Sequence, residues 1–130
     1  MVGLEKLGSR EFEMILQDPL KHERTILSTI ILHSVDMPEA VVKRSFRLDE
    51  KYFSSPFHKD LVRIISYFQK KDIAFDEHIT ASYLKHYNRF NEVAFLDVIA
   101  TVEVPYSVMV QHYEMLKSHY DSFSCFRIAV

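Results

Sequence analysis

Apolar residues recur at helical spacing along most of the chain. The clearest stripe, over 56–70, has apolar positions at i, i+4, i+7, i+8 and i+11, namely Phe57, Leu61, Ile64, Ile65 and Phe68. This spacing places them on one face of a helix. Similar stripes predict helices over about 19–33, 40–46, 77–88 and 90–101, and the pattern breaks at VEVP, 102–105.

Polar residues and prolines mark where these helices begin. Asp18, Asp36, Ser55 and Asp76 each precede a periodic stretch. The side-chain oxygen of such a residue can accept a hydrogen bond from a free amide of the first turn. Prolines at 19, 38 and 56 suit the first turn, where the missing N–H costs nothing. We therefore expect Ser55 to cap the helix that begins at Pro56.

The final segment carries a longer, heptad-like stripe. Met109, Tyr113, Leu116, Tyr120 and Phe123 fall at i, i+4, i+7, i+11 and i+14, as on one long helix. The sequence ends at SCFRIAV with apolar residues still recurring, so we expect the natural polypeptide to continue. The predicted organisation is a linker tail with a short helix (1–18), a helical bundle (19–101), and a long C-terminal helix or the start of a hairpin (106–130).

Glycine usage decides the fold class. The two glycines, Gly3 and Gly8, both lie near the start, and none follows. Hairpin turns and tight loops use glycine for left-handed backbone conformations. We therefore predict an all-α fold, a compact helical bundle followed by a long C-terminal helix or helical hairpin.

Charge and cysteine content narrow the class of protein. The net charge of −2, with Lys and Arg scattered among Asp and Glu, argues against strong direct binding of nucleic acid. Cys125 is the single cysteine, which excludes an internal disulfide and a cysteine-based zinc site and fits a reducing cytoplasm. The sequence holds no run long and apolar enough for a membrane span.

KYFSSPFHKDLVRII, 51–65, contains the one constellation that resembles a catalytic triad: Ser55, His58 and Asp60. A triad usually draws its members from separate elements, and no glycine-flanked serine is present. We favour a helix cap and a core stripe over a small hydrolase. No catalytic residue can be assigned.

The histidines do not show metal-ligand spacing. His112 and His119, for example, lie two turns apart on a helix, roughly 10.5 Å at 1.5 Å per residue. That is too far for one ion, and no HExxH motif occurs. We assign no metal ligand and expect no cofactor in this domain.

Large aromatic side chains crowd the final helix and are the remaining candidates for function. Such residues are enriched at interface centres. The candidate partner-binding residues are Tyr113, Leu116, Tyr120, Phe123 and Phe126. Core packing is the competing interpretation for Met109, Tyr113 and Leu116.

Two segments resemble a pair of related bacterial replication domains. ERTILSTIILHS, 23–34, is similar to their first helix, and KYFSSPFHKDLVRIISYFQKKDIAFDEHI, 51–79, is similar through Tyr52, Phe53, His58, Ile64, Ile65, Ile73 and Asp76. One is the N-terminal domain of DnaB-type replicative helicases. The other is the helicase-interacting C-terminal domain of DnaG-type primases. The resemblance spans about residues 20–120.

We favour the primase domain, because some twenty residues precede the first helix and 79–99 resembles the primase pattern more closely. The resemblance then implies a non-catalytic module that binds the N-terminal domain of the helicase, recruits primer synthesis to the fork and modulates the helicase. Zinc and magnesium would belong only to other domains of the parent primase, which makes RNA primers. The alternatives are the helicase's own N-terminal collar domain or an unrelated helical interaction domain.

Overall fold

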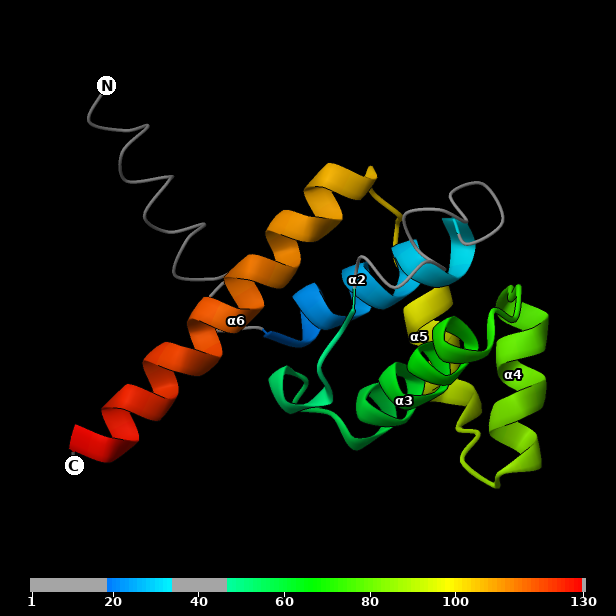
Figure 1. Ribbon diagram of the computed structural model, residues 1–130, viewed down its shortest axis with the longest axis horizontal. Helices are drawn as coiled ribbons and strands as arrows, with labels where there is room; N and C mark the ends of the chain where they lie inside the picture. Colours follow the sequence, from blue (N-terminus) through cyan, green and yellow to red (C-terminus); the bar gives the residue numbers. More distant parts are fainter. Residues whose placement is uncertain (1–18, 34–46, 130) are drawn as a thin grey trace.

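The computed structural model describes residues 19–33 and 47–129, with side chains described up to residue 121. Within these ranges every element is a helix, so the fold is all-α, as predicted (Figure 1). The elements are α2 (Pro19–His33), the 3-10 helix η2 (Glu50–Tyr52), α3 (Pro56–Lys71), α4 (Glu77–His86), α5 (Glu92–Ile99) and α6 (Tyr106–Ala129).

The predicted helix positions agree closely with those observed. The expected helix over 19–33 is α2, the stripe over 56–70 is α3, and the break at 102–105 separates α5 from α6. The predicted helices around EFEMIL and over 40–46 lie outside the described residues, as do the predicted caps Asp18 and Asp36.

Helix α2 lies at the centre of the molecule and packs against α3, α5 and α6. Its residues Ile26, Leu27, Ile30 and Ile31 are almost completely buried. The core continues with apolar residues from the other helices, including Leu61, Ile65, Phe68, Leu84, Val98, Met109 and Leu116. A single core therefore joins the first half of α6 to the bundle.

Polar residues of α2 also fix the linker that leads into α6. The Ser28 hydroxyl donates to the Thr101 carbonyl oxygen at 2.7 Å, and the Val104 amide donates to Thr29 Oγ1 at 3.1 Å. Both α2 side chains are fully buried. These bonds give partners to two backbone groups of the half-buried linker.

Left-handed backbone occurs without glycine at two helix ends. Asp72, after α3, has φ 55°, and Asn88, after α4, has φ 58°. Asp and Asn tolerate this conformation better than other residues with a side chain. The expected end of a helix near Asn88 agrees with this geometry, although the regular part of α4 stops at His86.

The predicted role of Ser55 is wrong in one respect. Ser55 occupies the N-cap position of α3, but its side chain makes no capping hydrogen bond. The Glu23 carboxylate of α2 holds the entry to the helix, accepting from the Ser54 amide at 3.1 Å and from the Ser55 amide at 3.4 Å. By contrast, Asp76 caps α4 as predicted, accepting from the Ile79 amide at 2.8 Å.

Candidate protein-interaction surface on the final helix

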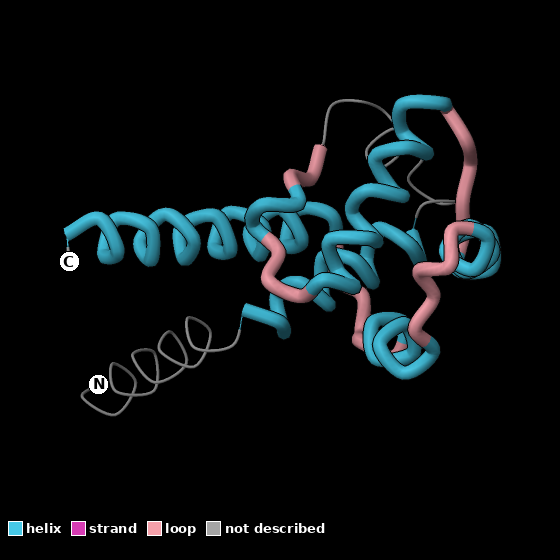
Figure 2. Tube along the Cα trace, turned by 90° about the horizontal axis from the view of Figure 1, so that it is seen from below, coloured by secondary structure: helices cyan, strands magenta, loops and turns pink. Residues whose placement is uncertain are grey.

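The long helix α6 is anchored to the bundle by its first half. Met109, Tyr113 and Leu116 are 0%, 5% and 1% exposed, and they form the i, i+4, i+7 stripe that packs on the core. Beyond them the helix continues to Ala129 and extends away from the other helices in both views (Figures 1 and 2). Part of α6 is therefore a structural helix and part is a projection.

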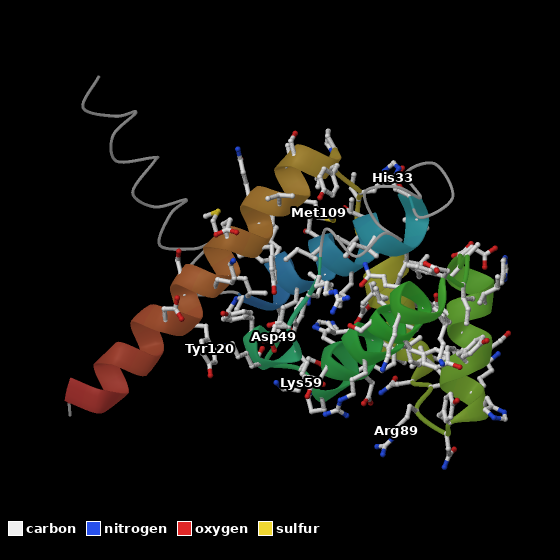
Figure 3. The ribbon with its side chains drawn as sticks, in the orientation of Figure 1. His33, Asp49, Lys59, Arg89, Met109 and Tyr120 are labelled. Atoms are coloured by element: carbon white, nitrogen blue, oxygen red, sulfur yellow. The ribbon has the colours of Figure 1, made fainter. Side chains whose placement is uncertain are left out.

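An aromatic cluster lies where α6 passes η2. The Asp49 amide donates to the Tyr113 hydroxyl at 2.9 Å. The Tyr52 ring packs edge-on against Tyr113 and against Tyr120, with centroids 5.9 and 5.2 Å apart. Burial raises the pKa of the Tyr113 hydroxyl. Figure 3 shows Tyr120 at the border between the bundle and the projecting part of α6.

Two lysines cover the outer side of this cluster. Lys51 Nζ lies 5.0 Å from the Tyr52 ring centre, and Lys117 Nζ lies 5.2 Å from that of Tyr113. Lys117 also pairs with Glu114 at 3.0 Å, and this hydrogen bond raises the pKa of Lys117. The two ammonium groups thus lie over the Tyr52 and Tyr113 rings, where cation–π attraction holds them against the cluster.

The structure separates the five residues predicted to bind a partner. Tyr113 and Leu116 lie in the core, where the competing interpretation placed them. Tyr120 is 37% exposed and lies beyond the last core residue of α6. The side chains of Phe123 and Phe126 lie outside the described part of the chain, although the helix backbone runs through both positions.

Sequence reasoning did not assign Tyr52 or Lys117 to this surface. The periodicity of α6 gives no information about η2, because η2 approaches Tyr113 from more than fifty positions earlier in the chain. The sequence did hold one signal for a role of Tyr52. The pair Tyr52–Phe53 lies in the segment 51–79, on which the family resemblance rests.

The apparent triad Ser55, His58 and Asp60 is not assembled. His58 is buried, and its Nδ1 lies 2.8 Å from Glu23 Oε1. Asp60 instead pairs with Arg63 on the solvent side of α3, at 3.3 Å. His58 is therefore paired with a carboxylate of α2 inside the bundle, and we assign this pair a structural role, not a catalytic one.

The Glu23 carboxylate lies at the centre of this group of hydrogen bonds. Besides the two backbone amides and His58, it accepts from the Ser54 hydroxyl at 2.7 Å. Burial alone would raise the pKa of Glu23, but the hydrogen bonds from His58 and Ser54 lower it below its ordinary value. The carboxylate is thus held in its charged form, bound between α2 and the start of α3.

A second histidine contact joins α2 to α6. His22 Nδ1 and His112 Nδ1 are 2.7 Å apart, which requires one nitrogen to donate and the other to accept. Burial lowers the pKa of His112, and the positive charge of Lys21 lowers it further. Among the residues that the structure describes, no three His, Cys, Asp or Glu side chains are grouped closely enough to hold a metal ion.

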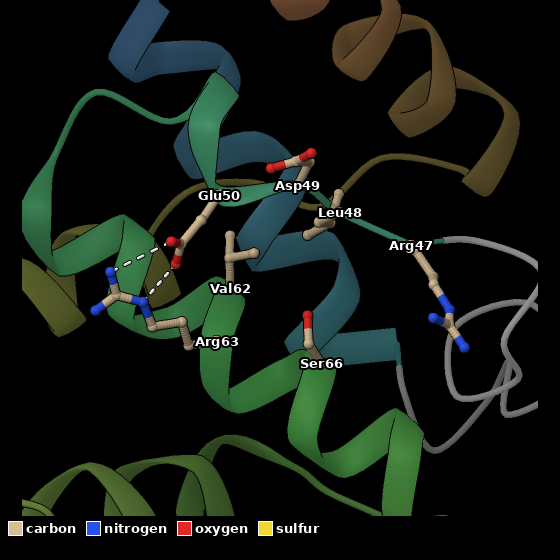
Figure 4. Close-up of a pocket in the computed structure, with 7 residues that line it drawn as sticks. All are labelled: Arg47, Leu48, Asp49, Glu50, Val62, Arg63 and Ser66. Atoms are coloured by element: carbon tan, nitrogen blue, oxygen red, sulfur yellow. Dashed lines mark hydrogen bonds and ion pairs between the residues drawn. The ribbon is translucent and has the colours of Figure 1, made fainter.

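A pocket of about 580 Å³ lies between α3 and the segment that enters η2, lined by Arg47, Leu48, Asp49, Glu50, Val62, Arg63 and Ser66 (Figure 4). Arg63 forms a two-armed ion pair with Glu50, one arm at 3.3 Å, drawn as dashed lines in the figure. The charges at this end therefore compensate one another. The described lining residues do not pair a nucleophile with a base.

Comparison with known proteins agrees with this helical arrangement. A family model described as the DnaB-like helicase N terminal domain matches residues 16–118, most of the chain. The chain belongs to this family. The matched range includes the whole described bundle and ends two residues before Tyr120. No curated protein and no solved structure gives a significant match.

Membership of the DnaB-like helicase N-terminal domain family agrees with a helical domain associated with helicases. The DnaB N-terminal domain is a non-catalytic domain that acts through protein–protein contacts. None of the helices in the described ranges has the length and apolar character needed to cross a bilayer.

Proposed function

We propose that this chain is a non-catalytic interaction module of the bacterial replication machinery, active in the cytoplasm, and that α6 carries the contact with its partner. The observation that supports this proposal most directly is the division of α6. Its core stripe ends at Leu116, and the helix continues for more than three turns beyond it. A helix that projects past its own core leaves a face that a partner can cover.

The proposed contact centres on Tyr120 and extends to Phe123 and Phe126. Tyr120 is the last described aromatic residue, and Tyr52 supports its ring from one side. A ring held on one side and exposed on the other loses little freedom when it is bound, which favours a role as an interface anchor.

Two candidate parents share this fold. For the primase-type parent that the sequence analysis favours, the partner is the N-terminal domain of the DnaB-type helicase, and the module recruits primer synthesis to the fork. For the helicase-type parent, the module is part of the helicase collar and associates with further copies. The family match supports a helicase-associated helical domain, which both candidates are.

A binding assay against the cognate helicase hexamer tests the proposal. We expect the wild-type chain to be retained by immobilised helicase and the Tyr120→Ala/Phe123→Ala variant to lose at least about tenfold in affinity, as expected for an anchor residue. Tyr87→Ala is the matched control, because Tyr87 is also an exposed tyrosine but lies after α4. Circular dichroism verifies that each variant is folded.

The retention assay combined with analytical ultracentrifugation separates the two parents. Retention by helicase without self-association supports the primase-type module. Concentration-dependent dimers or larger rings in analytical ultracentrifugation, lost in the Tyr120→Ala/Phe123→Ala variant, support the collar domain. If a folded double mutant binds the helicase and self-associates like the wild type, α6 is not the contact surface.

A further inference from the structure

Helix α5 has apolar residues on both of its sides. Its sequence is EVAFLDVI, in which Glu92 and Asp97 are the only polar residues. Phe95 and Val98 face the core and are 7% and 0% exposed. A helix that is apolar all round is normally buried on every side. Helix α5 is buried on one side only.

The outer side of α5 carries a continuous apolar stripe. Val93, Leu96 and Ala100 lie at i, i+3 and i+7, which places them on one helical face. Val93 is 72% exposed and Leu96 is 56% exposed. Large side chains exposed at adjacent positions are expected where a partner binds, whereas single exposed apolar residues need no explanation.

A groove beside this stripe extends the surface. It lies between α4 and α5 and has a volume of about 450 Å³. Its apolar lining residues are Ala81, Phe90, Phe95 and Leu96, and its polar ones are Glu77, His78, Lys85 and Glu92. The Phe90 and Phe95 rings are in contact, with centroids 5.5 Å apart. Leu96 belongs to both the stripe and the groove, so the two form one surface.

Carboxylates border this surface on both sides. At 100° per residue, Glu92 and Asp97 fall on opposite edges of the stripe formed by Val93, Leu96 and Ala100. Both are exposed, and neither forms an ion pair within the described part of the chain. The nearby Lys85 lies over the Phe90 ring, at 4.8 Å from its centre, on the far wall of the groove.

This charge pattern distinguishes between two kinds of occupant. A second copy of the chain, docked through the same face about a two-fold axis, would bring carboxylates of one stripe toward those of the other, which is unfavourable. A helix with an apolar stripe flanked by Lys or Arg would bury Val93 and Leu96 and pair with Glu92 and Asp97.

We propose that the outer face of α5, with the adjoining groove, is a second docking surface that binds an amphipathic helix of another protein, with basic residues flanking its apolar stripe. This surface is separate from the one proposed on α6. Helix α4, which forms one wall of the groove, lies at the end of the molecule remote from the projecting end of α6 (Figure 1). The module can thus contact two partners at once.

Fluorescence anisotropy with a designed peptide tests this surface. The probe is a labelled amphipathic helix of leucine and lysine, about four turns long, and its counterpart has glutamate in place of every lysine. We expect saturable binding of the lysine peptide to the full chain, weakened by salt, and at least about tenfold weaker binding of the glutamate peptide.

Matched variants locate the binding. Val93→Ser/Leu96→Ser is expected to weaken binding of the lysine peptide by about tenfold or more, and Glu92→Gln/Asp97→Asn to weaken it about threefold and reduce its salt dependence. Two control variants remove similar groups elsewhere. Leu20→Ser removes an exposed leucine of α2, and Glu114→Gln/Asp121→Asn removes two exposed carboxylates of α6. Both should leave binding of the lysine peptide unchanged.

Three results would overturn the proposal. The first is equal binding of the glutamate peptide. The second is unchanged binding by Val93→Ser/Leu96→Ser, which would mean nonspecific attraction to an acidic protein. The third is self-association that this double variant abolishes, which would assign the face to a second copy. None of these results depends on Tyr120 or Phe123, so the proposal on α6 is tested separately.

Discussion

At the residue scale, Glu23 is a buried carboxylate whose partners lie on another element. It accepts from two backbone amides, the Ser54 hydroxyl and the His58 ring, all within or next to the start of α3. A carboxylate that receives several hydrogen bonds tolerates burial, because these bonds replace the water it has lost. Glu23 thus joins α2 to the residues that lead into α3, and to His58 in its first turn.

Removing this carboxylate should destabilise the bundle. We expect Glu23→Gln to lower the free energy of unfolding by about 3 kcal/mol, since it removes a buried carboxylate on which four hydrogen bonds converge. Ser55→Ala should change it by less than about 0.5 kcal/mol, because the Ser55 side chain makes no cap bond. Urea denaturation measures both. A larger effect for Ser55→Ala would restore the serine as the cap.

The lowered pKa of Glu23 predicts an acid limit to stability. Because the folded-state pKa lies below the ordinary value of 4.5, the folded protein binds this proton less readily than the unfolded chain. The stabilisation is therefore complete above about pH 4.5 and is lost as the pH falls through the folded-state pKa. Urea midpoints measured from pH 6 downward should fall less steeply in Glu23→Gln than in the wild type.

His112 predicts a second pH dependence in a higher range. Its pKa lies below the ordinary 6.5, so folding favours the neutral ring, which shares a hydrogen bond with His22. Its contribution is present above about pH 6.5 and is lost as the pH falls through the folded-state pKa. We expect His112→Gln to flatten the unfolding free energy between about pH 7 and pH 5. An unchanged slope would show that this contact is not linked to protonation.

At the scale of elements, the helices were predictable and the contacts between them were not. Apolar periodicity and caps such as Asp76 are local signals, so the positions of α2, α3 and α6 could be read from the sequence. The hydrogen bonds of Glu23 join residues more than thirty positions apart, and the contact between His22 and His112 spans ninety. No local pattern predicts which helix supplies such a partner.

The linker before α6 offers a test of one such contact. Thr29→Val keeps the shape of the buried side chain but removes the oxygen that accepts from the Val104 amide. We expect a loss of about 1–2 kcal/mol and faster hydrogen exchange at Val104, because that amide loses its partner. Thr101→Val, which removes only a bond to the Asp97 carbonyl within the same helical turn, should cost less than about 0.5 kcal/mol.

At the scale of the whole molecule, the core and the projecting end of α6 should be separable. The described core residues end at Leu116, and no described side chain beyond it is buried. Deleting residues 122–130 is therefore expected to change the free energy of unfolding by less than about 0.5 kcal/mol, while weakening the binding through α6 to which Phe123 and Phe126 contribute. A loss above about 2 kcal/mol would mean that the projecting end also stabilises the fold.

The central place of α2 has a consequence for synthesis on the ribosome. During translation α2 emerges long before α6, yet Met109 and Leu116 complete the core in which its apolar face is buried. Until Met109 and Leu116 have left the ribosome, the apolar face of α2 stays partly exposed, at Ile26, Leu27, Ile30 and Ile31. Exposed apolar surface of this kind favours aggregation. We therefore expect the nascent chain to remain open to chaperones until α6 has left the exit tunnel.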